Sequence, residues 1–330
     1  MGHNVFSLQG VYQNSPEGTL IRGSIPNLYQ NEHLKSVALQ CNKENIHPEL
    51  LDWADIVIMT HNSRVDINDH PQPWLNGNWD RLKKSKKPVI WRSIGQSSQQ
   101  IEEALKKFRK EGLKIVRYSP TEETIPDYQG SDSLIRFYAD PQALDGYTGI
   151  TPRIVNISQA MFGGPNAKSR GDHMNLAEFK QIIDGLDWKI FGRDNENAGE
   201  HNGGVLSYED LKAMMRFNRA YLYTGTRPAP YTLAFMEAFM LGIPIISIGP
   251  KMGNSIYTNQ RTFEVPEIIG PTGDAGFWAD NIGQLREYCT TLINDSDLAR
   301  SVGERGRIKA IQIFGKEKIK REWEMFFKSL

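Results

Sequence analysis

Short apolar runs rich in β-branched residues alternate with stretches of helix length along almost the whole chain of 330 residues. Several of these runs are apolar throughout, which is typical of parallel strands that are covered by helices on both faces. We therefore expect strands at 4–8, 36–40, 55–60, 88–93, 114–118, 134–138, 153–158, 188–192, 220–224, 244–248 and 263–265. This βα alternation predicts an α/β fold with parallel sheets.

The stretches between the runs carry the 3–4 residue spacing of amphipathic helices. It predicts helices at 98–111, 175–185, 207–217, 281–295, 297–312 and 316–329, and a nearly all-apolar one at 232–241. Residues 62–80, 160–174 and 249–275 are expected to be long loops, and loops of this length in α/β proteins are often functional. The turn-rich stretch 145–152 predicts a boundary between an N-terminal domain, 1–148, and a C-terminal domain, 149–330.

Charge and cysteine content exclude several classes of protein. Lys and Arg together number 39, as do Asp and Glu, and this balance disfavours a protein built to hold a phosphate backbone. Only Cys41 and Cys289 are present, so no disulfide framework or cysteine-rich zinc site is expected. The histidines lack metal-binding spacing, and we expect no metal site. Without a secretory pattern or a long apolar run, the chain is expected to be cytoplasmic with no membrane span.

The common nucleotide and nucleophile motifs are missing. No G-x-G-x-x-G follows the first expected strand, and neither a P-loop nor a G-x-S-x-G elbow occurs. The sequence therefore does not favour a nicotinamide-dependent enzyme, a P-loop enzyme or an α/β-hydrolase.

The most informative segment is 221–248, which reads as strand, loop, helix, glycine stop and strand. Thr232 is placed to cap the helix, and N–H groups at such a helix start form a natural site for a diphosphate. Glu237 is the only charge in this helix, so it needs a partner, either a protein donor or ligand hydroxyls. An ordinary buried βαβ unit, with Glu237 bonded to a backbone group, accounts for the local pattern equally well.

The same segment resembles a donor-binding motif of the GT-B glycosyltransferases, especially the large retaining GT4-type family (glycosyl transferases group 1). That family has E-P-F-G-L-x-x-x-E-A-M-A-x-G-x-P-V-V where this chain reads A-P-Y-T-L-A-F-M-E-A-F-M-L-G-I-P-I-I from Ala229 to Ile246. The matching residues are Pro230, Leu233, Glu237, Ala238, Gly242 and Pro244. The resemblance covers most of 134–330, whereas the N-terminal half matches only in its βα rhythm.

The resemblance implies a GT-B fold, with two Rossmann-like domains facing a cleft. The N-terminal domain would bind the acceptor and the C-terminal domain a nucleoside-diphosphate sugar, with the last helix, about 316–329, packing back on the N-terminal domain. The implied activity is transfer of a hexosyl or pentosyl group to an acceptor hydroxyl, with retention of configuration and no obligatory metal or cofactor. Glycans, small molecules and modified DNA bases are the acceptor classes considered.

The resemblance also implies roles for individual residues. Glu237 would bind the donor ribose, and the first-turn N–H groups of Tyr231, Thr232 and Leu233 would line the phosphate site. Gly192 and Arg193 would lie near the nucleotide, and Leu206 near the base. For the cations that offset the leaving diphosphate, the candidates are Lys168, Arg170, Arg193 and Arg227. Lys168 and Arg170 are equally consistent with solvated loop charges.

Departures from the family pattern keep other functions open. Ala229 replaces the first glutamate of the family's E-x7-E pair, and Ser158-Gln159 stands where the family begins its G-R-x-x-x-x-K-G loop. Arg92, Ser93 and Gln96 occupy the region of the family's N-terminal histidine, which makes Arg92 a catalytic candidate. A catalytically silent nucleotide-sugar-binding protein and a sugar-nucleotide epimerase of the same fold are the alternatives.

A basic run comprises Arg81, Lys83, Lys84, Lys86 and Lys87. It is expected to be a solvated helix end. The competing interpretation is an anion-binding patch for an acidic glycan or DNA, with Trp74, Trp79 and Trp91 interleaved; this patch would suit a phage-type transferase acting on DNA bases.

Overall fold

The computed structural model describes residues 31–41, 45–60, 73–95, 98–165, 167–255 and 259–330. They form two compact units. Unit 1 contains the described residues up to Ile135 together with Glu322–Leu330, and unit 2 contains Arg136–Arg321. The chain passes from unit 2 back to unit 1 within its last helix, α13 (Lys316–Lys328). The strand expected at 4–8 lies outside the described residues.

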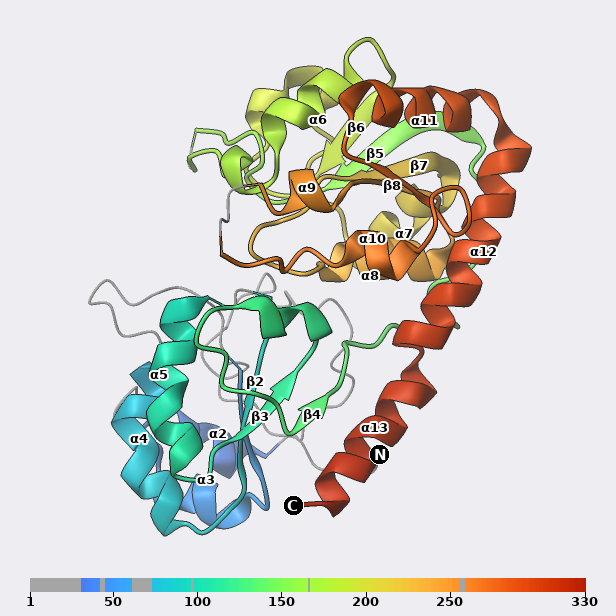
Figure 1. Ribbon diagram of the computed structural model, residues 1–330. Helices are drawn as coiled ribbons and strands as arrows, with labels where there is room; N and C mark the ends of the chain where they lie inside the picture. The colour runs from blue at the N-terminus through green and yellow to red at the C-terminus, as the bar shows by residue number, and fades with distance from the viewer. Residues whose placement is uncertain (1–30, 42–44, 61–72, 96–97, 166, 256–258) are drawn as a thin grey trace. The chain divides into compact units, whose positions relative to one another are not determined.

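Unit 1 is built on a four-stranded parallel sheet in the order β1-β2-β3-β4. Its strands are β1 (Val57–Thr60), β2 (Val89–Arg92), β3 (Lys114–Arg117) and β4 (Ser133–Leu134). The other elements are α2 (Glu32–Ala38), α3 (Pro48–Trp53), α4 (Pro73–Lys84), α5 (Gln99–Lys110) and the short 3₁₀ helix η2 (Pro120–Thr124). The apolar stripes of α4 and α5 form one buried cluster with β2 and β3, so these helices cover the sheet (Figure 1).

Unit 2 contains a five-stranded parallel sheet in the order β6-β5-β7-β8-β9. The strands are β5 (Thr151–Ile157), β6 (Trp188–Phe191), β7 (Asn218–Tyr223), β8 (Ile245–Ile248) and β9 (Phe277–Ala279). The helices are α6 (Leu176–Ile183), α7 (Tyr208–Phe217), α8 (Leu233–Leu241), α9 (Pro250–Gly253), α10 (Val265–Ile269), α11 (Ile282–Asn294) and α12 (Ser296–Phe314), with 3₁₀ helices η3 (Gly171–His173) and η4 (Glu196–His201). In Figure 1, α6 and α11 lie on one face of this sheet, and α7, α8 and α10 on the other.

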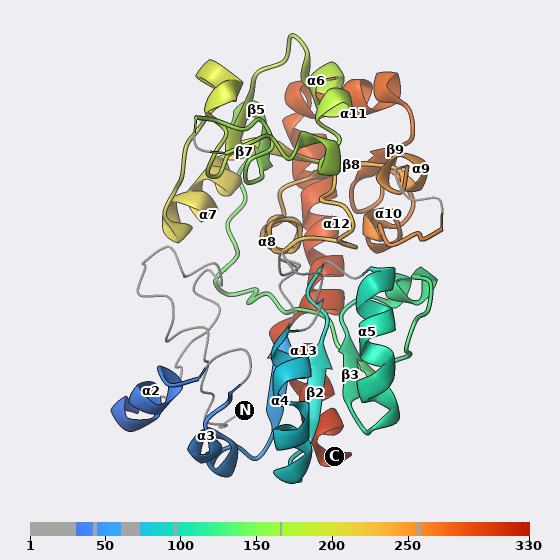
Figure 2. The same cartoon turned by 90° about the vertical axis from the view of Figure 1, so that its left-hand side faces the viewer.

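Helix α8 begins and ends as its sequence predicts. The Thr232 side chain accepts a hydrogen bond from the N–H of Phe235, and Gly242 ends the helix in the left-handed conformation, with φ of 91°. Being apolar nearly all round, α8 is buried between the sheet and α12, beside which it lies in Figures 1 and 2. Gly303 of α12 permits this approach, because a Cβ there would lie 2.1 Å from the Gly242 carbonyl oxygen.

Several local predictions are wrong. Residues 36–40 are not a strand but the end of α2, which Asn31 caps, and the turn that follows it. The loop expected over 62–80 is helical from Pro73 onward, and the loop expected over 249–275 contains α9 and α10. No strand forms at 263–265; the last strand is β9, which the sequence pattern did not predict.

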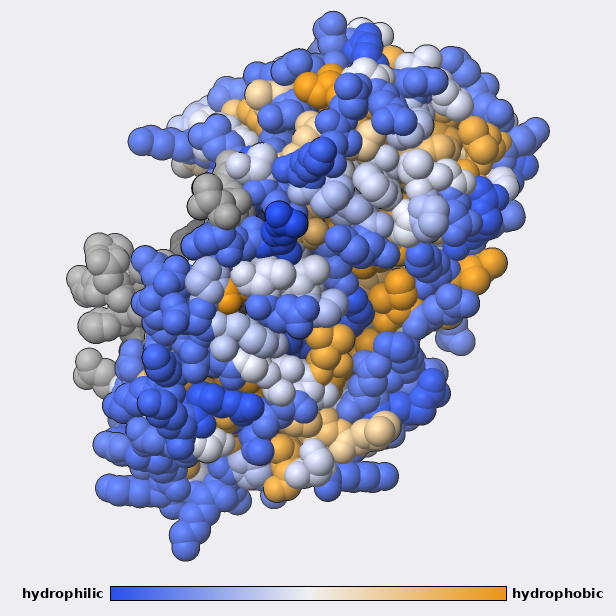
Figure 3. All heavy atoms as spheres, viewed as in Figure 1, coloured by the Kyte–Doolittle hydropathy of each residue, from blue (hydrophilic) through white to orange (hydrophobic). Residues whose placement is uncertain are grey.

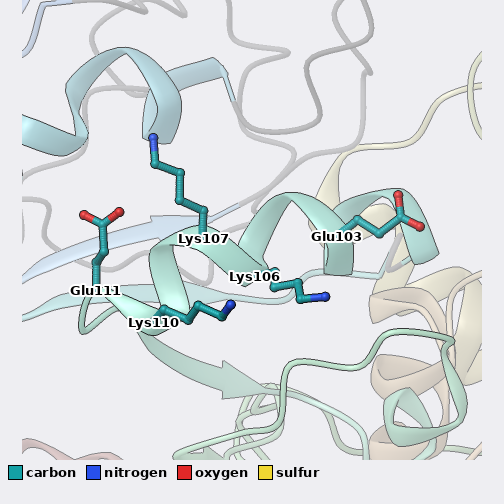
Figure 4. A pocket seen from close by; sticks show the side chains of 5 residues that line it. All are labelled: Glu103, Lys106, Lys107, Lys110 and Glu111. Atoms are coloured by element: carbon teal, nitrogen blue, oxygen red, sulfur yellow. The ribbon is translucent and has the colours of Figure 1, made fainter.

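The two tryptophans closest to the basic run, Trp79 and Trp91, belong to the core of unit 1 and are 4% and 1% exposed. They therefore do not interleave exposed aromatic rings with the lysines, as the anion-patch interpretation expected. The surface over α4 and α5 is hydrophilic (Figure 3), and an open pocket on it is lined by Glu103, Lys106, Lys107, Lys110 and Glu111 (Figure 4). All five residues lie in α5 or directly after it, and all are charged. Ligand pockets are mostly lined by apolar side chains, so this one is not a good candidate site.

Among the helices that the structure describes, none is long and apolar enough to cross a membrane.

Candidate functional site

The strand order of unit 2 identifies one edge of its sheet as the candidate site. From β5 the chain turns to β6 on one side, and from β7 it turns to β8 on the other side. The connections therefore diverge between the neighbouring strands β5 and β7, at their carboxyl ends. Ligands of open α/β sheets bind at such a topological switch point. The loops that follow β5, β6 and β7 carry eight of the eleven site residues predicted from the sequence, and two more, Leu233 and Glu237, lie in α8, which follows the loop after β7.

Hydrogen bonds join the loop after β5 to the loop after β7. The Asn175 side chain donates to the Thr224 carbonyl at 2.7 Å, and the Thr224 hydroxyl donates to the Met174 carbonyl at 2.6 Å. The backbone N–H of Arg227 donates to the His173 carbonyl at 2.7 Å. Both Asn175 and Thr224 are buried, so this edge of the sheet is fixed by satisfied polar groups.

The start of α8 presents backbone donors at this edge. Thr232 and Leu233 are half-buried and Tyr231 is buried. Within the described part of the chain, no acceptor is assigned to the N–H groups of Leu233 and Ala234. Such first-turn donors, together with the helix dipole, suit a phosphate oxygen.

Glu237 lies one turn further along α8 and is 5% exposed. The sequence-based expectation that this carboxylate is buried is confirmed. Whether it binds a ribose remains a prediction. Behind α8, burial raises the pKa of the Tyr223 hydroxyl, and its neighbours Thr232 and Thr226 offset that effect only in part.

The four candidate clamping cations differ in their surroundings. Arg227 is buried and its guanidinium donates to the Ser255 hydroxyl at 2.8 Å and to the Asp172 carbonyl, so it braces the loops after β5, β7 and β8. Arg193 is half-buried in the loop after β6. Lys168 and Arg170 are exposed in the loop after β5. Arg193, Lys168 and Arg170 are thus the cations with the more open positions.

The loop after β6 folds back beside its own strand. Gly192 has φ of 133° and donates its N–H to the Gly204 carbonyl at 2.9 Å. Leu206 is half-buried at the end of this loop, just before Ser207 caps α7. Gly192, Arg193 and Leu206, predicted to lie near the nucleotide, therefore belong to one continuous segment.

An ion pair between the half-buried Arg136 and the buried Glu264 supports the segment that leads into α8, and the sequence did not single it out. The Arg136 guanidinium forms two hydrogen bonds with the Glu264 carboxylate, one of 3.0 Å, and lies over the rings of Tyr231 and Phe314. The Glu264 N–H donates to the Pro230 carbonyl at 3.1 Å. Desolvation lowers the pKa of Arg136, but the hydrogen bonds and charge of Glu264, together with Tyr231, outweigh it and raise that pKa. The pair thus fixes the segment that leads into α8.

Arg92 is the one predicted site residue in unit 1. It ends β2, is 4% exposed, and lies over the rings of Tyr118 and Trp323. The adjacent Ser93 donates its hydroxyl to Glu122 at 2.8 Å. These contacts place Arg92 and Ser93 at the carboxyl end of β2. Gln96 lies outside the described residues.

No cluster of His, Cys, Asp and Glu able to hold a metal ion occurs among the residues that the structure describes.

Known proteins resemble this chain in structure but not detectably in sequence. No protein-family model matches the chain, and no curated protein matches its sequence. Among solved structures, Anabaena Alr3699/HepE in complex with UDP and glucose matches with a TM-score of 0.61 and 13% identity, over 86% of this chain and 81% of that one. Sucrose-phosphate synthase from Thermosynechococcus elongatus matches with a TM-score of 0.60 and 11% identity, over 93% and 82%.

A glycosyltransferase from Rickettsia africae also matches, with a TM-score of 0.59 and 13% identity, over 94% of this chain and 86% of that one. These matches span both units, and the two parallel sheets have the α/β architecture expected from the sequence. The chain has the two-domain GT-B fold.

Proposed function

We propose that this protein is a glycosyltransferase that transfers a sugar from a nucleoside-diphosphate sugar to an acceptor hydroxyl. The observation that carries the proposal is the carboxyl edge of the unit 2 sheet. There, the first turn of α8 and the buried Glu237 lie at the switch point between β5 and β7. The Anabaena protein of similar fold was crystallised with UDP, with UDP and glucose, and with UDP-glucose.

In the proposed mechanism, binding and charge stabilisation supply the catalysis. Glu237 accepts hydrogen bonds from the ribose hydroxyls, and the N–H groups at the start of α8 bind the diphosphate. Arg193 and Lys168, with Arg170 nearby in the chain, offset the negative charge that develops on the leaving diphosphate. Gly192 and Leu206 line the nucleotide side. Arg227, which braces the loops, is proposed to keep the site in place.

Acceptor recognition is proposed for unit 1, around Arg92 and Ser93. A glycan or a small molecule with a free hydroxyl is the acceptor class that we propose. A DNA-base acceptor rested on the basic run. The balanced charge of the chain disfavours it, and the buried positions of Trp79 and Trp91 add no exposed aromatic ring to that run. Retention of configuration, which rests on the sequence resemblance, is proposed as well. The anomeric coupling constant of the first product, measured by NMR, tests it.

A Glu237→Gln variant tests the donor site. The isosteric amide removes the charge, so binding of the correct nucleotide is expected to weaken by about tenfold to a hundredfold, the range for a hydrogen bond to a charged group. The thermal midpoint without ligand is expected to stay close to that of the wild type. The dissociation constant is measured by calorimetry and the midpoint by scanning fluorimetry.

Glu267→Gln is the control, because this carboxylate lies on the exposed side of α10 and has no proposed role in donor binding. It is expected to bind nucleotide normally. Unchanged affinity in Glu237→Gln would refute the ribose-binding role. Slow donor hydrolysis without acceptor, seen in the wild type, would separate an active transferase from a silent binding protein.

A further inference from the structure

Asn195 is a fully buried side chain in the loop after β6. A buried amide needs hydrogen-bond partners, and its partners are all backbone atoms. Its amide nitrogen lies 2.7 Å from the Ser158 carbonyl oxygen, 3.2 Å from that of Gly192 and 3.3 Å from that of Arg193. Its amide oxygen accepts from the Phe162 N–H at 3.1 Å.

These partners belong to two different loops. Ser158 and Phe162 follow β5, in the loop that also carries Lys168 and Arg170, while Gly192 and Arg193 follow β6. The Ala160 N–H adds a bond of 2.8 Å to the Arg193 carbonyl, and the Arg170 N–H one of 2.6 Å to the Ala160 carbonyl. One side chain therefore joins the loops that bear three of the proposed clamping cations.

The backbones of the two loops are packed closely against each other. A Cβ on Gly192 would lie 2.2 Å from the Ser158 carbonyl oxygen, which is the same oxygen that Asn195 binds. The Arg193 carbonyl oxygen thus accepts hydrogen bonds from the Asn195 side chain and the Ala160 N–H. The preceding residue, Gly192, is packed closely against the Ser158 carbonyl. A side chain that extends from so fixed a backbone is preorganised for a ligand at the sheet edge.

We propose that Asn195 is a positioning residue for the donor site, and that it acts by setting the backbone from which Arg193 reaches the diphosphate. This inference rests on the proposed function. Asn195 makes no ligand contact itself, since its side chain is fully buried. Its effect on the nucleotide therefore passes through Arg193.

A double-mutant cycle tests this mechanism. Asn195→Ala is expected to weaken binding of the nucleoside diphosphate about tenfold in the wild-type background. In an Arg193→Ala background, the same change is expected to weaken binding less than about twofold, because residues that act as one unit are not additive. Affinity is measured by calorimetry with the nucleotide that stabilises the wild type. Equal losses in both backgrounds, or no loss in either, would overturn the proposal.

Two further variants separate positioning from general stability. Asn218→Ala removes another buried asparagine, at the opposite end of the sheet, where it bonds the Met214 carbonyl at 2.7 Å. It is expected to lower the thermal midpoint without changing nucleotide affinity. Asn195→Asp keeps the acceptor for Phe162 but sets a carboxylate oxygen against the carbonyls, so its affinity is expected to fall at least as far as that of Asn195→Ala.

The outcomes also distinguish this inference from the function beneath it. If the wild type binds no nucleotide, the proposed function fails. If the wild type binds and Asn195→Ala binds equally well, only the positioning role fails.

Discussion

An Arg193→Ala variant is expected to keep the thermal transition of the wild-type protein and to lose about a hundredfold to a thousandfold in kcat/KM, the range for removing one preorganised donor from a developing anion. The physical reason is the charge that builds up on the leaving diphosphate. Arg193 is half-buried, on a loop whose backbone is held by buried hydrogen bonds. The backbone from which it extends is therefore fixed before the donor binds, so only the side chain has to be ordered on meeting that charge.

Donor hydrolysis without acceptor measures this loss, since it needs no acceptor to be identified. Arg193→Lys keeps the charge but not the planar fork, and is expected to recover part of the rate. Arg153→Ala is the matched control. This arginine lies near the amino end of β5, in the same sheet, and pairs with Asp187 at 2.9 Å. A normal rate for Arg193→Ala, or a lost thermal transition, would contradict the assigned role.

The second large effect concerns stability. Arg117→Ala is expected to lower the free energy of unfolding of unit 1 by about 3–5 kcal/mol, the cost of breaking a buried ion pair. The side chains of Arg117 and Glu102 are both 0% exposed and form two hydrogen bonds of 2.7 and 2.8 Å. Desolvation lowers the pKa of Arg117, but the hydrogen bonds and charge of Glu102, with smaller effects of Glu122 and Tyr128, outweigh it and raise that pKa. Removing the arginine would leave the glutamate buried without its main counter-charge.

Denaturant unfolding, followed by a probe in unit 1, measures the loss. Lys83→Ala breaks a more exposed pair with Glu111 and is expected to cost far less stability, because solvent screens the attraction between exposed charges. Replacing both partners, as Arg117→Met with Glu102→Leu, is expected to recover much of the stability, since neither charge remains buried alone. A loss in Arg117→Ala no greater than in Lys83→Ala would refute the account.

The sequence predicts the sheet strands of both units well where burial on two faces makes the strand apolar. Seven of the expected runs correspond to β1, β2, β3, β5, β6, β7 and β8. The run at 36–40 misled because Leu34, Val37 and Ala38, at i, i+3 and i+4, form one buried helical face that is short enough to read as a strand. The start of helix α4 was missed because its proline, glycine and asparagines suggest a loop. Its buried residues nevertheless have helical spacing: Leu75, Asn78, Trp79 and Leu82.

Some features of the candidate site can be predicted from the sequence and others cannot. The start of α8 and the burial of Glu237 follow from a local pattern of caps and apolar residues, so the sequence alone predicts them. Asn195 and the Arg136–Glu264 pair do not, because their partners lie far away along the chain. Asn195 binds a carbonyl 37 residues away, and Arg136 binds a carboxylate 128 residues away. The periodicity of apolar residues predicts helices and strands but not contacts between residues that are distant in the chain. The polar segment around Asn195 therefore predicts only a loop.

The most direct test of the account is the thermal midpoint of the wild-type protein with UDP, GDP, ADP, CDP and TDP and their common sugar conjugates. A ligand that binds only the folded state raises the midpoint by mass action. The account predicts a clear rise with one nucleotide series, and a much smaller rise with the same ligand in Glu237→Gln. No rise with any of them, at concentrations far above ordinary donor affinities, would contradict a nucleotide-sugar site at the carboxyl edge of the unit 2 sheet.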